Sequence, residues 1–292
     1  EPLFFEVLNK KKESRKDYFR NENWDKIPFL NGGLFEPDKM DFYAPTDYGR
    51  SVYVNTVKIP NKWFYDLFEV FERYNFTVDE STSLDIEIAV DPEMLGKIFE
   101  NLLAEIDEET GKTARKKTGS FYTPREVVEY IVNTSLYNYL VNHTSVDKSK
   151  LQHLIESPET TPEIAKEDVN CILNIISSIK IIDPACGSGA FLMGAMHKMI
   201  EIIRVLDPNS YFWKEKIVSN IKDSVFSQYI KEKLKSENIY YIIKLGLLRD
   251  NLYGVDIQPM AIELTKLRFF LSLIVDETIV DEKDNRGILA LP

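Results

Sequence analysis

Cysteine and histidine are both scarce in this chain, and their scarcity excludes several kinds of site. The two cysteines, Cys171 and Cys186, cannot form the disulfide framework of a small secreted protein, and low cysteine usage is typical of a reducing compartment. The three histidines, His143, His153 and His197, lack cysteine or acidic companions at ligand spacing. We therefore expect no metal site and a cytoplasmic location.

Long apolar runs are also missing. No stretch reaches the roughly 18 to 20 residues that a membrane-spanning helix needs, and no signal-peptide pattern opens the sequence. We expect no membrane partner. Hydrophobic residues still make up 44% of the 292 residues, which is enough to fill a core and suits about two domains.

Positive charge is in deficit, since 36 basic residues face 47 acidic ones and the net charge is −11. This is the wrong sign for a module whose main task is to grip DNA phosphates. Residues 111–125 are an exception, because this segment has no carboxylate and carries Lys112, Arg115, Lys116, Lys117 and Arg125. The segment is either a solvated loop or a place of phosphate contact beside a binding site.

The clearest chemical signal is a loop rich in small residues between a predicted strand and a predicted helix. Residues 183–192 read Asp-Pro-Ala-Cys-Gly-Ser-Gly-Ala-Phe-Leu, after the β-branched run at 179–182 and before an apolar helical stretch at 190–203. Glycines let a ligand approach the backbone closely, and the helix start offers unpaired N–H groups. The dinucleotide fingerprint needs a third glycine, and Leu192 stands there.

Two acidic residues indicate which ligand this loop holds. Asp183 opens the loop, where a carboxylate repels phosphate but suits an ammonium or sulfonium group. A second strand at 252–257 ends in Asp256, at a position where an acid accepts hydrogen bonds from ribose hydroxyls. S-adenosylmethionine carries an ammonium group, a sulfonium group and ribose hydroxyls, and no phosphate. Many more residues separate the two acids than the roughly 30 of a plain βαβ unit, so we expect an insertion.

Helical patterns flank this loop. Thr123 to Glu126 forms a capping box that opens a helix, whose inward residues are Val127, Val128, Ile131 and Val132. Its threonine hydroxyl serves as a cap, as a ligand contact or as both.

Residues 142–168 are polar and predict a surface excursion, followed by a helix near 168–177. Residues 258–275 are apolar nearly all round and predict a buried helix packed on the sheet.

The first part of the chain favours helices over a sheet. Residues 63–74 place aromatic and aliphatic side chains at helical spacing, which predicts core packing rather than a base-stacking platform: Phe64, Leu67, Phe68 and Phe71. Asp91-Pro92 opens a further helix that runs to about Ile106.

Three stretches together resemble an adenine-specific DNA methyltransferase of restriction-modification or phage-defence systems, most closely the methyltransferase part of fused type IIG enzymes. They are Gly-Ser-Phe-Tyr-Thr-Pro at 119–124, the loop at 183–189 and the acid at 256. Residues 28–35 and 95–103 add to the resemblance, which spans most of the chain. It implies that Thr123 contacts the methionine end of the cofactor, that the Asp183 loop wraps it and that Asp256 holds the ribose.

The resemblance implies an α/β fold, a partial Rossmann-like core dependent on S-adenosylmethionine, behind a mostly helical domain. We expect an accessory domain at 1–90, helices leading into the cofactor site at 91–140, and the methyltransferase part at 141–292, with a helical insertion at about 207–250. The expected cofactor-binding residues are Phe121, Tyr122, Thr123, Pro124, Asp183, Pro184, Ala185, Gly187, Ser188, Gly189, Phe191, Asp256 and Ile257. The expected DNA phosphate contacts are Lys112, Arg115, Lys116 and Lys117.

The family's catalytic motif, Asn/Asp-Pro-Pro-Tyr/Phe, does not occur in these residues. In the order of motifs seen here it would follow Pro292, so we expect a piece of a longer protein that binds cofactor but is inactive alone and meets double-stranded DNA through the full-length protein. Two alternatives stay open: a methyltransferase acting on RNA, protein or a small molecule, and a nicotinamide-binding oxidoreductase, which Asp183 and Leu192 disfavour. The sequence leaves the oligomeric state open.

Overall fold

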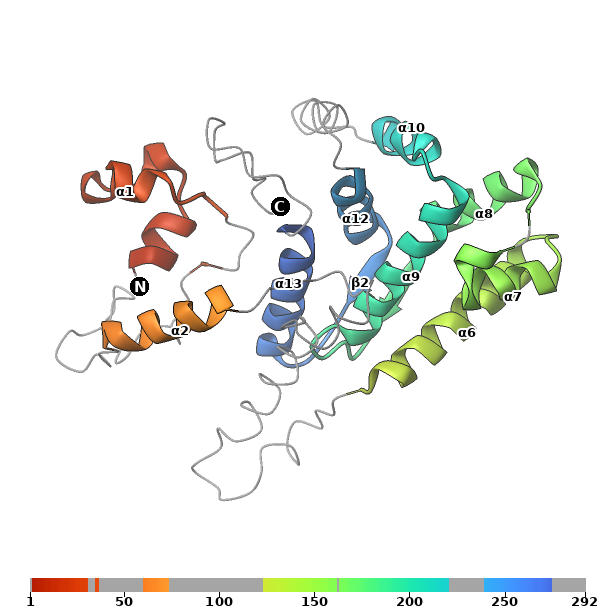
Figure 1. Ribbon diagram of the computed structural model, residues 1–292, viewed down its shortest axis with the longest axis horizontal. Helices are drawn as coiled ribbons and strands as arrows, with labels where there is room; N and C mark the ends of the chain where they lie inside the picture. Colours follow the sequence, from red (N-terminus) through yellow and green to blue (C-terminus); the bar gives the residue numbers. More distant parts are fainter. Residues whose placement is uncertain are drawn as a thin grey trace, which may run out of the picture. The chain divides into compact units, whose positions relative to one another are not determined.

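The computed structural model describes residues 2–30, 35–36, 60–73, 123–161, 163–220 and 239–274 (Figure 1). The chain divides into two compact units, residues 1–91 with 277–292, and residues 92–276. The helix expected from Asp91 to Ile106 lies outside the described residues. None of the described helices is long and apolar enough to cross a membrane.

In the first unit, short helical segments gather around one buried arginine. A π-helical segment η1 (Pro2–Leu8), two 3-10 turns η2 (Lys12–Ser14) and η3 (Asp17–Phe19), and α1 (Glu22–Asp25) follow one another. Arg15 is only 1% exposed, and its guanidinium donates hydrogen bonds of 2.9 to 3.2 Å to the carbonyls of Val7, Lys10, Trp24 and Ile27. One side chain therefore satisfies backbone acceptors from the whole segment.

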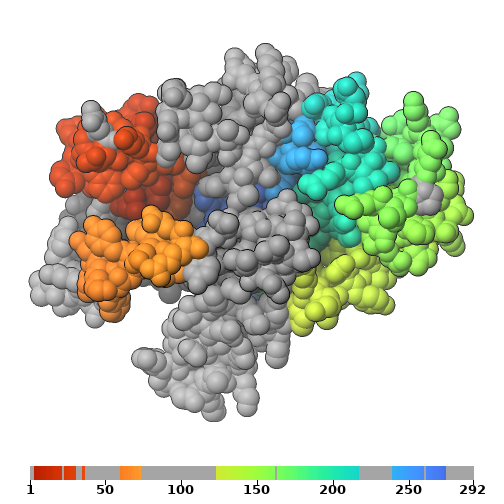
Figure 2. Space-filling model, in the orientation of Figure 1, coloured from red at the N-terminus to blue at the C-terminus, as the bar shows by residue number. Residues whose placement is uncertain are grey.

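Helix α2 (Asn61–Arg73) corrects the expectation of core packing at residues 63–74. Phe64, Leu67 and Phe68 are 45%, 45% and 57% exposed, and Figure 2 shows α2, in orange, at the surface. The apolar spacing correctly predicted a helix. Spacing shows only that apolar residues share a face, and it does not show whether another element covers that face.

The second unit is built around a pair of parallel strands. Strand β1 (Ile181–Asp183) pairs with β2 (Leu252–Gly254) in the register Ile181 to Leu252 and Asp183 to Gly254. Its helices are α6 (Arg125–His143), α7 (Lys148–Glu156), α8 (Lys166–Ser178), α9 (Ala190–Leu206), α10 (Tyr211–Asn220), α12 (Ile239–Asp250) and α13 (Pro259–Ile274). The described part is thus mostly helical with a small parallel sheet.

Helix α9 forms the centre of this unit. It contacts α6, α7, α8, α12 and both strands (Figure 1), and most of its apolar side chains are buried, as expected of a helix with neighbours on several sides. Gly194 is the point of closest approach to α6, because a Cβ there would lie 2.6 Å from Cγ1 of Val128. The apolar stretch predicted at 190–203 is therefore confirmed as a core helix.

Helix α6 begins later and is buried along a narrower stripe than the sequence suggested. Its buried residues are Val128, Val132, Leu136 and Leu140, spaced four apart. Val127 and Ile131 are each 43% exposed, so the expectation that both point inward is wrong. Helices α9, α7 and α8 contact α6, and residues four apart lie on one face of a helix, so the buried residues of α6 form one narrow stripe.

The polar stretch at 142–168 is not a surface excursion, and this expectation is also corrected. Asp147 caps α7 by accepting hydrogen bonds from the N–H groups of Ser149 and Lys150 at 2.9 and 3.2 Å. Leu151, Leu154 and Ile155 are at most 2% exposed. Polar residues dominate the composition of this segment, yet three apolar side chains at positions i, i+3 and i+4 suffice to dock a short helix.

The described part of segment 207–250 is helical. Asp207 starts α10 by accepting hydrogen bonds from the N–H groups of Tyr211 at 2.9 Å and Trp213 at 3.2 Å. Trp213 and Tyr241 are each 3% exposed, and α12 packs against α9, β2 and α13. Burial of these two aromatics favours a role in core packing over a role in stacking nucleic-acid bases.

Candidate cofactor site

The loop between β1 and α9 has the conformation that its glycines permit. Gly187 and Gly189 have φ angles of +54° and +82°, the left-handed region that side chains disfavour. Gly189 is the N-cap of α9, and its carbonyl accepts the N–H of Met193 at 2.9 Å. The strand, loop and helix predicted at 183–192 are therefore present, with the helix start facing the loop.

Asp183 lies at the end of β1, and its two carboxylate oxygens differ in their hydrogen bonding. Oδ1 accepts the N–H of Ala185 at 3.1 Å, an Asx-type bond that turns the chain out of the strand. Oδ2 is buried and has no hydrogen-bond partner in the part of the chain that the structure describes. A buried carboxylate oxygen without a donor is costly, so this atom fits a ligand that brings an N–H donor or a positive charge.

Asp256 reaches back from the second strand to the same loop. Its Oδ2 accepts the N–H of Gly187 at 2.8 Å, and its Oδ1 accepts the N–H of Gln258 at 2.8 Å. Parallel pairing of β1 and β2 brings their carboxyl ends together, so the two acids singled out from the sequence flank one glycine loop. Each carboxylate oxygen can still accept a further hydrogen bond.

Helix α13 holds the other side of the loop through two polar residues that the sequence analysis missed. Thr265 Oγ1 donates to the carbonyl of Gly187 at 2.9 Å, and Arg268 Nη1 donates to the carbonyl of Ser188 at 2.8 Å. Both residues are buried, at 7% and 6% exposure. The expectation of a buried helix at 258–275 is confirmed. Its apolar pattern gives no sign that these two polar residues contact the loop.

Cys186 lies in the loop as a packing residue. It is 5% exposed, and burial raises the pKa of its thiol, with a further contribution from the nearby carboxylates of Asp183 and Asp256. The thiol therefore stays protonated at neutral pH, which favours a packing role over that of a nucleophile. Among the described residues, no group of three or more histidine, cysteine or acidic side chains could hold a metal ion.

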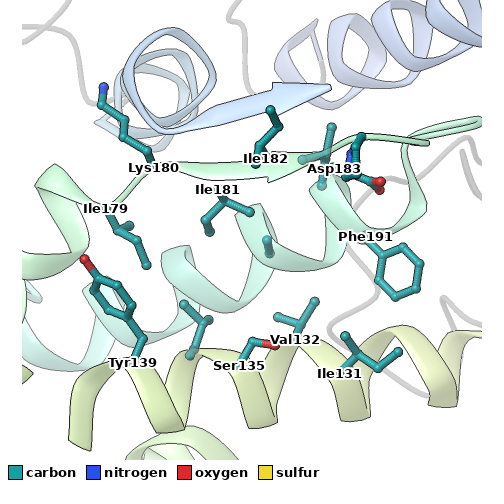
Figure 3. Close-up of a pocket in the computed structure, with 14 residues that line it drawn as sticks. Ile131, Val132, Ser135, Tyr139, Ile179, Lys180, Ile181, Ile182, Asp183 and Phe191 are labelled. Atoms are coloured by element: carbon teal, nitrogen blue, oxygen red, sulfur yellow. The ribbon is translucent and has the colours of Figure 1, made fainter. Parts of the chain in front are cut away.

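A cavity of about 490 Å³ lies between α6 and β1 and is mostly apolar (Figure 3). Ile131, Ser135 and Tyr139 of α6 face Ile179 and Ile181 across it, with Asp183 at one end. Its lining includes residues 179–184 but neither Asp256 nor the two loop glycines. This cavity adjoins the acid-lined loop and supplies few polar partners of its own.

Comparison with known proteins supports the chemistry of this loop. Residues 159–292 match the family model described as the MmeI DNA-methyltransferase domain. This segment of the chain is therefore similar to a DNA-methyltransferase domain. The match includes β1, the glycine loop, β2 and α13, so every hydrogen bond described around the loop lies within the methyltransferase segment.

Two relatives extend this similarity. A Methanocaldococcus jannaschii protein, named as a type II restriction enzyme and methyltransferase, is 30% identical over 305 residues, covering 100% of this chain and 22% of the relative. The adenine-specific methyltransferase BrxX of Escherichia coli O9:H4 (strain HS) is 31% identical over 112 residues, covering 35% of this chain and 9% of the relative. The chain thus spans less than a quarter of either relative. No solved structure matches it.

The segment before α6 corrects one expectation from the sequence. The helix begins at Arg125, with Pro124 as its N-cap and no side-chain capping bond, so the capping box of Thr123 and Glu126 does not form. The carbonyl of Pro124 accepts the N–H groups of Val127 and Val128 at 3.0 and 3.1 Å instead. Pro124, with an extended ψ of 146°, is the N-cap, so the helix starts one residue later than the motif suggests. Phe121, Tyr122 and the basic residues Lys112, Arg115, Lys116 and Lys117 lie outside the described residues.

Proposed function

We propose that the loop at 183–189 and Asp256 bind S-adenosylmethionine over the carboxyl ends of β1 and β2, as part of a Rossmann-like methyltransferase core. The observation that carries the proposal is the hydrogen bond from Gly187 N–H to Asp256, which joins a glycine loop to an acid from the neighbouring parallel strand. Ligands of open parallel sheets bind at the carboxyl ends of strands, where such loops meet.

The charges around the loop suit this cofactor. Its α-ammonium group would meet Oδ2 of Asp183, which has no partner among the described residues, and its ribose hydroxyls would donate to Asp256. Ile257 is 89% exposed directly after this acid and offers an apolar surface to the adenine. Phe191, Pro184, Ala185, Ser188 and Gly189 complete the loop side, and Thr123, Pro124, Phe121 and Tyr122 are proposed for the methionine end.

A nicotinamide dinucleotide fits this site poorly. Its pyrophosphate would approach the carboxylates of Asp183 and Asp256, which flank the loop, and like charges at that range repel. The place of the third fingerprint glycine is held by Leu192, which is 2% exposed in the core. This arrangement favours a cofactor with a positive charge and no phosphate.

For the whole protein we propose transfer of the methyl group to the exocyclic amino group of adenine in double-stranded DNA, within a restriction-modification enzyme. The family match and the names of both relatives support DNA over RNA, protein or small molecules as the acceptor. Lys112, Arg115, Lys116 and Lys117 are proposed to contact DNA phosphates. Within this chain, the described residues supply binding groups for the cofactor.

Calorimetric titration tests the cofactor assignment. S-adenosylmethionine and its demethylated product, S-adenosylhomocysteine, should bind, and NAD should give no heat. Asp183→Asn should weaken binding, because an amide at this position no longer attracts an ammonium group. Glu159→Gln, which changes an exposed acid in the 3-10 turn η6 (Pro158–Thr160), is the matched control and should bind normally. NAD binding without binding of either sulfur cofactor would overturn the proposal.

A further inference from the structure

Thr265 and Arg268 of α13 hold two consecutive carbonyl groups of the glycine loop. We infer that these two side chains are positioning residues, which hold the loop so that the N–H of Ser188 points toward the carboxylate of the cofactor's methionine end. This inference rests on the proposed function and adds to it the two side chains that keep the loop ready for binding. Neither side chain is proposed to touch the cofactor.

The contacts are short and come from one face of one helix. Thr265 Oγ1 donates to Gly187 O at 2.9 Å, while Arg268 Nη1 donates to Ser188 O at 2.8 Å and approaches Ser188 Oγ at 3.4 Å. Residues three apart in a helix share a face, so a single rigid element fixes both carbonyls. Burial of both side chains strengthens these bonds, because water does not compete for the loop oxygens.

Holding a carbonyl fixes the direction of the next N–H. In a planar trans peptide the C=O of one residue and the N–H of the next point in opposite directions. The carbonyl of Gly187 is bound by Thr265 on the α13 side, so the N–H of Ser188 points to the opposite side. No described residue accepts a hydrogen bond from this N–H, whereas the N–H groups of Gly187 and Gly189 are bonded to Asp256 and to Cys186 O.

The groups next to the N–H of Ser188 favour a carboxylate at this one position, while Asp183 and Asp256 favour the ammonium and ribose groups on the flanks of the loop. The start of α9 follows immediately and carries the partial positive charge of a helix N-terminus. The Arg268 guanidinium, 6% exposed, lies behind the carbonyl of Ser188 and adds a full positive charge. S-adenosylmethionine has one anionic group, the α-carboxylate of its methionine. The ribose and adenine are neutral, so Thr265 and Arg268 should affect binding of the methionine end and should not affect binding of the nucleoside end.

Isosteric variants and two ligands test this inference in the purified protein. Thr265→Val removes the donor and keeps the shape, and Thr265→Ser keeps the hydroxyl as its matched control. Arg268→Met removes the second donor. We expect Thr265→Val and Arg268→Met each to weaken S-adenosylhomocysteine binding by about three- to tenfold in calorimetry, in line with the loss of one hydrogen bond. Adenosine, which lacks the methionine end, should bind all variants equally, and Thr265→Ser should match the wild type.

Three results would overturn the inference. The first is unchanged S-adenosylhomocysteine affinity in Thr265→Val. The second is an equal loss of S-adenosylhomocysteine and adenosine affinity, which would indicate general damage to the fold rather than a specific loss of the loop's orientation. The third is a wild-type protein that binds neither ligand, and this result alone would also remove the proposed function. If Arg268→Met does not fold, the comparison of Thr265→Val with Thr265→Ser still tests the inference.

Discussion

The backbone N–H of Gly187 donates a hydrogen bond of 2.8 Å to the carboxylate of Asp256, and this bond ties the ends of two parallel strands together. The same carboxylate accepts the N–H of Gln258 just before α13. Asp256 therefore shapes the loop, and its remaining acceptor capacity faces the proposed ribose site. One side chain serves the fold and, in our proposal, the cofactor.

Asp256→Ala should weaken S-adenosylhomocysteine binding by about 1.5 to 3 kcal/mol, since charge-assisted hydrogen bonds to ribose are lost and Gly187 loses its acceptor. Asp256→Asn keeps one acceptor oxygen and should fall between the alanine variant and the wild type. Calorimetry measures both, with Glu263→Gln, a change in an ion pair on α13, as control. Normal binding by the alanine variant at an unchanged melting temperature would refute the ribose assignment.

The two loop glycines should differ in their tolerance of alanine. At Gly189 a Cβ would lie 2.8 Å from Thr265 Cγ2 at a φ of +82°, whereas at Gly187 nothing lies within 4 Å at a φ of +54°. Gly187→Ala should cost about 1 to 2 kcal/mol from backbone strain alone. Gly189→Ala should cost more, because steric overlap adds to the strain. Urea unfolding compares them, and equal losses would mean that the contact with Thr265 is unimportant.

Asn251 is expected to be the most sensitive polar residue at the start of β2. It is 1% exposed, and its amide donates to the carbonyls of Ile176 and Ile179 at 2.9 and 2.8 Å, joining the end of α8 to the sheet. Asn251→Ala should destabilise the protein by about 2 to 4 kcal/mol, because it leaves two carbonyls without a donor. Asn174→Ala, at an exposed site on α8, should change stability by less than about 0.5 kcal/mol. Similar melting temperatures for the two variants would contradict this.

The two cysteines should react very differently with iodoacetamide. Cys171 is exposed, while Cys186 is buried with a raised pKa. A raised pKa means that the reactive thiolate of Cys186 forms only above the pH at which an ordinary thiol ionises. We expect alkylation of Cys171 alone at neutral pH, and of both residues in denaturant. Peptide mass spectrometry across a pH series distinguishes them, and fast labelling of native Cys186 would show that the loop opens.

Methyl transfer should be absent when the 292-residue chain acts alone. Its sequence contains no Pro-Pro-aromatic motif, and a flipped adenine needs an aromatic surface and acceptors for its amino group. Tritiated S-adenosylmethionine with mixed-sequence duplex DNA should therefore give no labelled methyladenine, although the cofactor binds. Labelling above background would place the base-binding residues within these 292 positions.

The chemical centre of the site could be predicted because its signals are local. Small residues between a β-branched run and an apolar run predict a strand, a tight loop and a helix, and Asp183, Gly189 and Asp256 all lie where that pattern places them. Parallel pairing then follows from the helices between the strands. The family match, which includes the loop and Asp256, and the two relatives support the resemblance.

The missed features depend on tertiary neighbours. Thr265 and Arg268 look like ordinary helix residues until the loop carbonyls lie against them. The exposure of Ile131 and Phe64 depends on whether another element covers their helix face, which periodicity does not encode. The docking of α7 was different, because the Asp147 cap and the spacing of Leu151 and Leu154 were visible in the sequence and were outweighed by its polar composition.

The three side chains that shape the glycine loop come from far along the chain. Asp256, Thr265 and Arg268 bond to residues 69, 78 and 80 positions earlier. During synthesis, the loop sequence therefore emerges long before the groups that hold its backbone, and a nascent chain that stops short of α13 carries the motif without the site. Contacts of such long range form late in folding, so in our proposal cofactor binding should report that the chain through α13 has been made and packed.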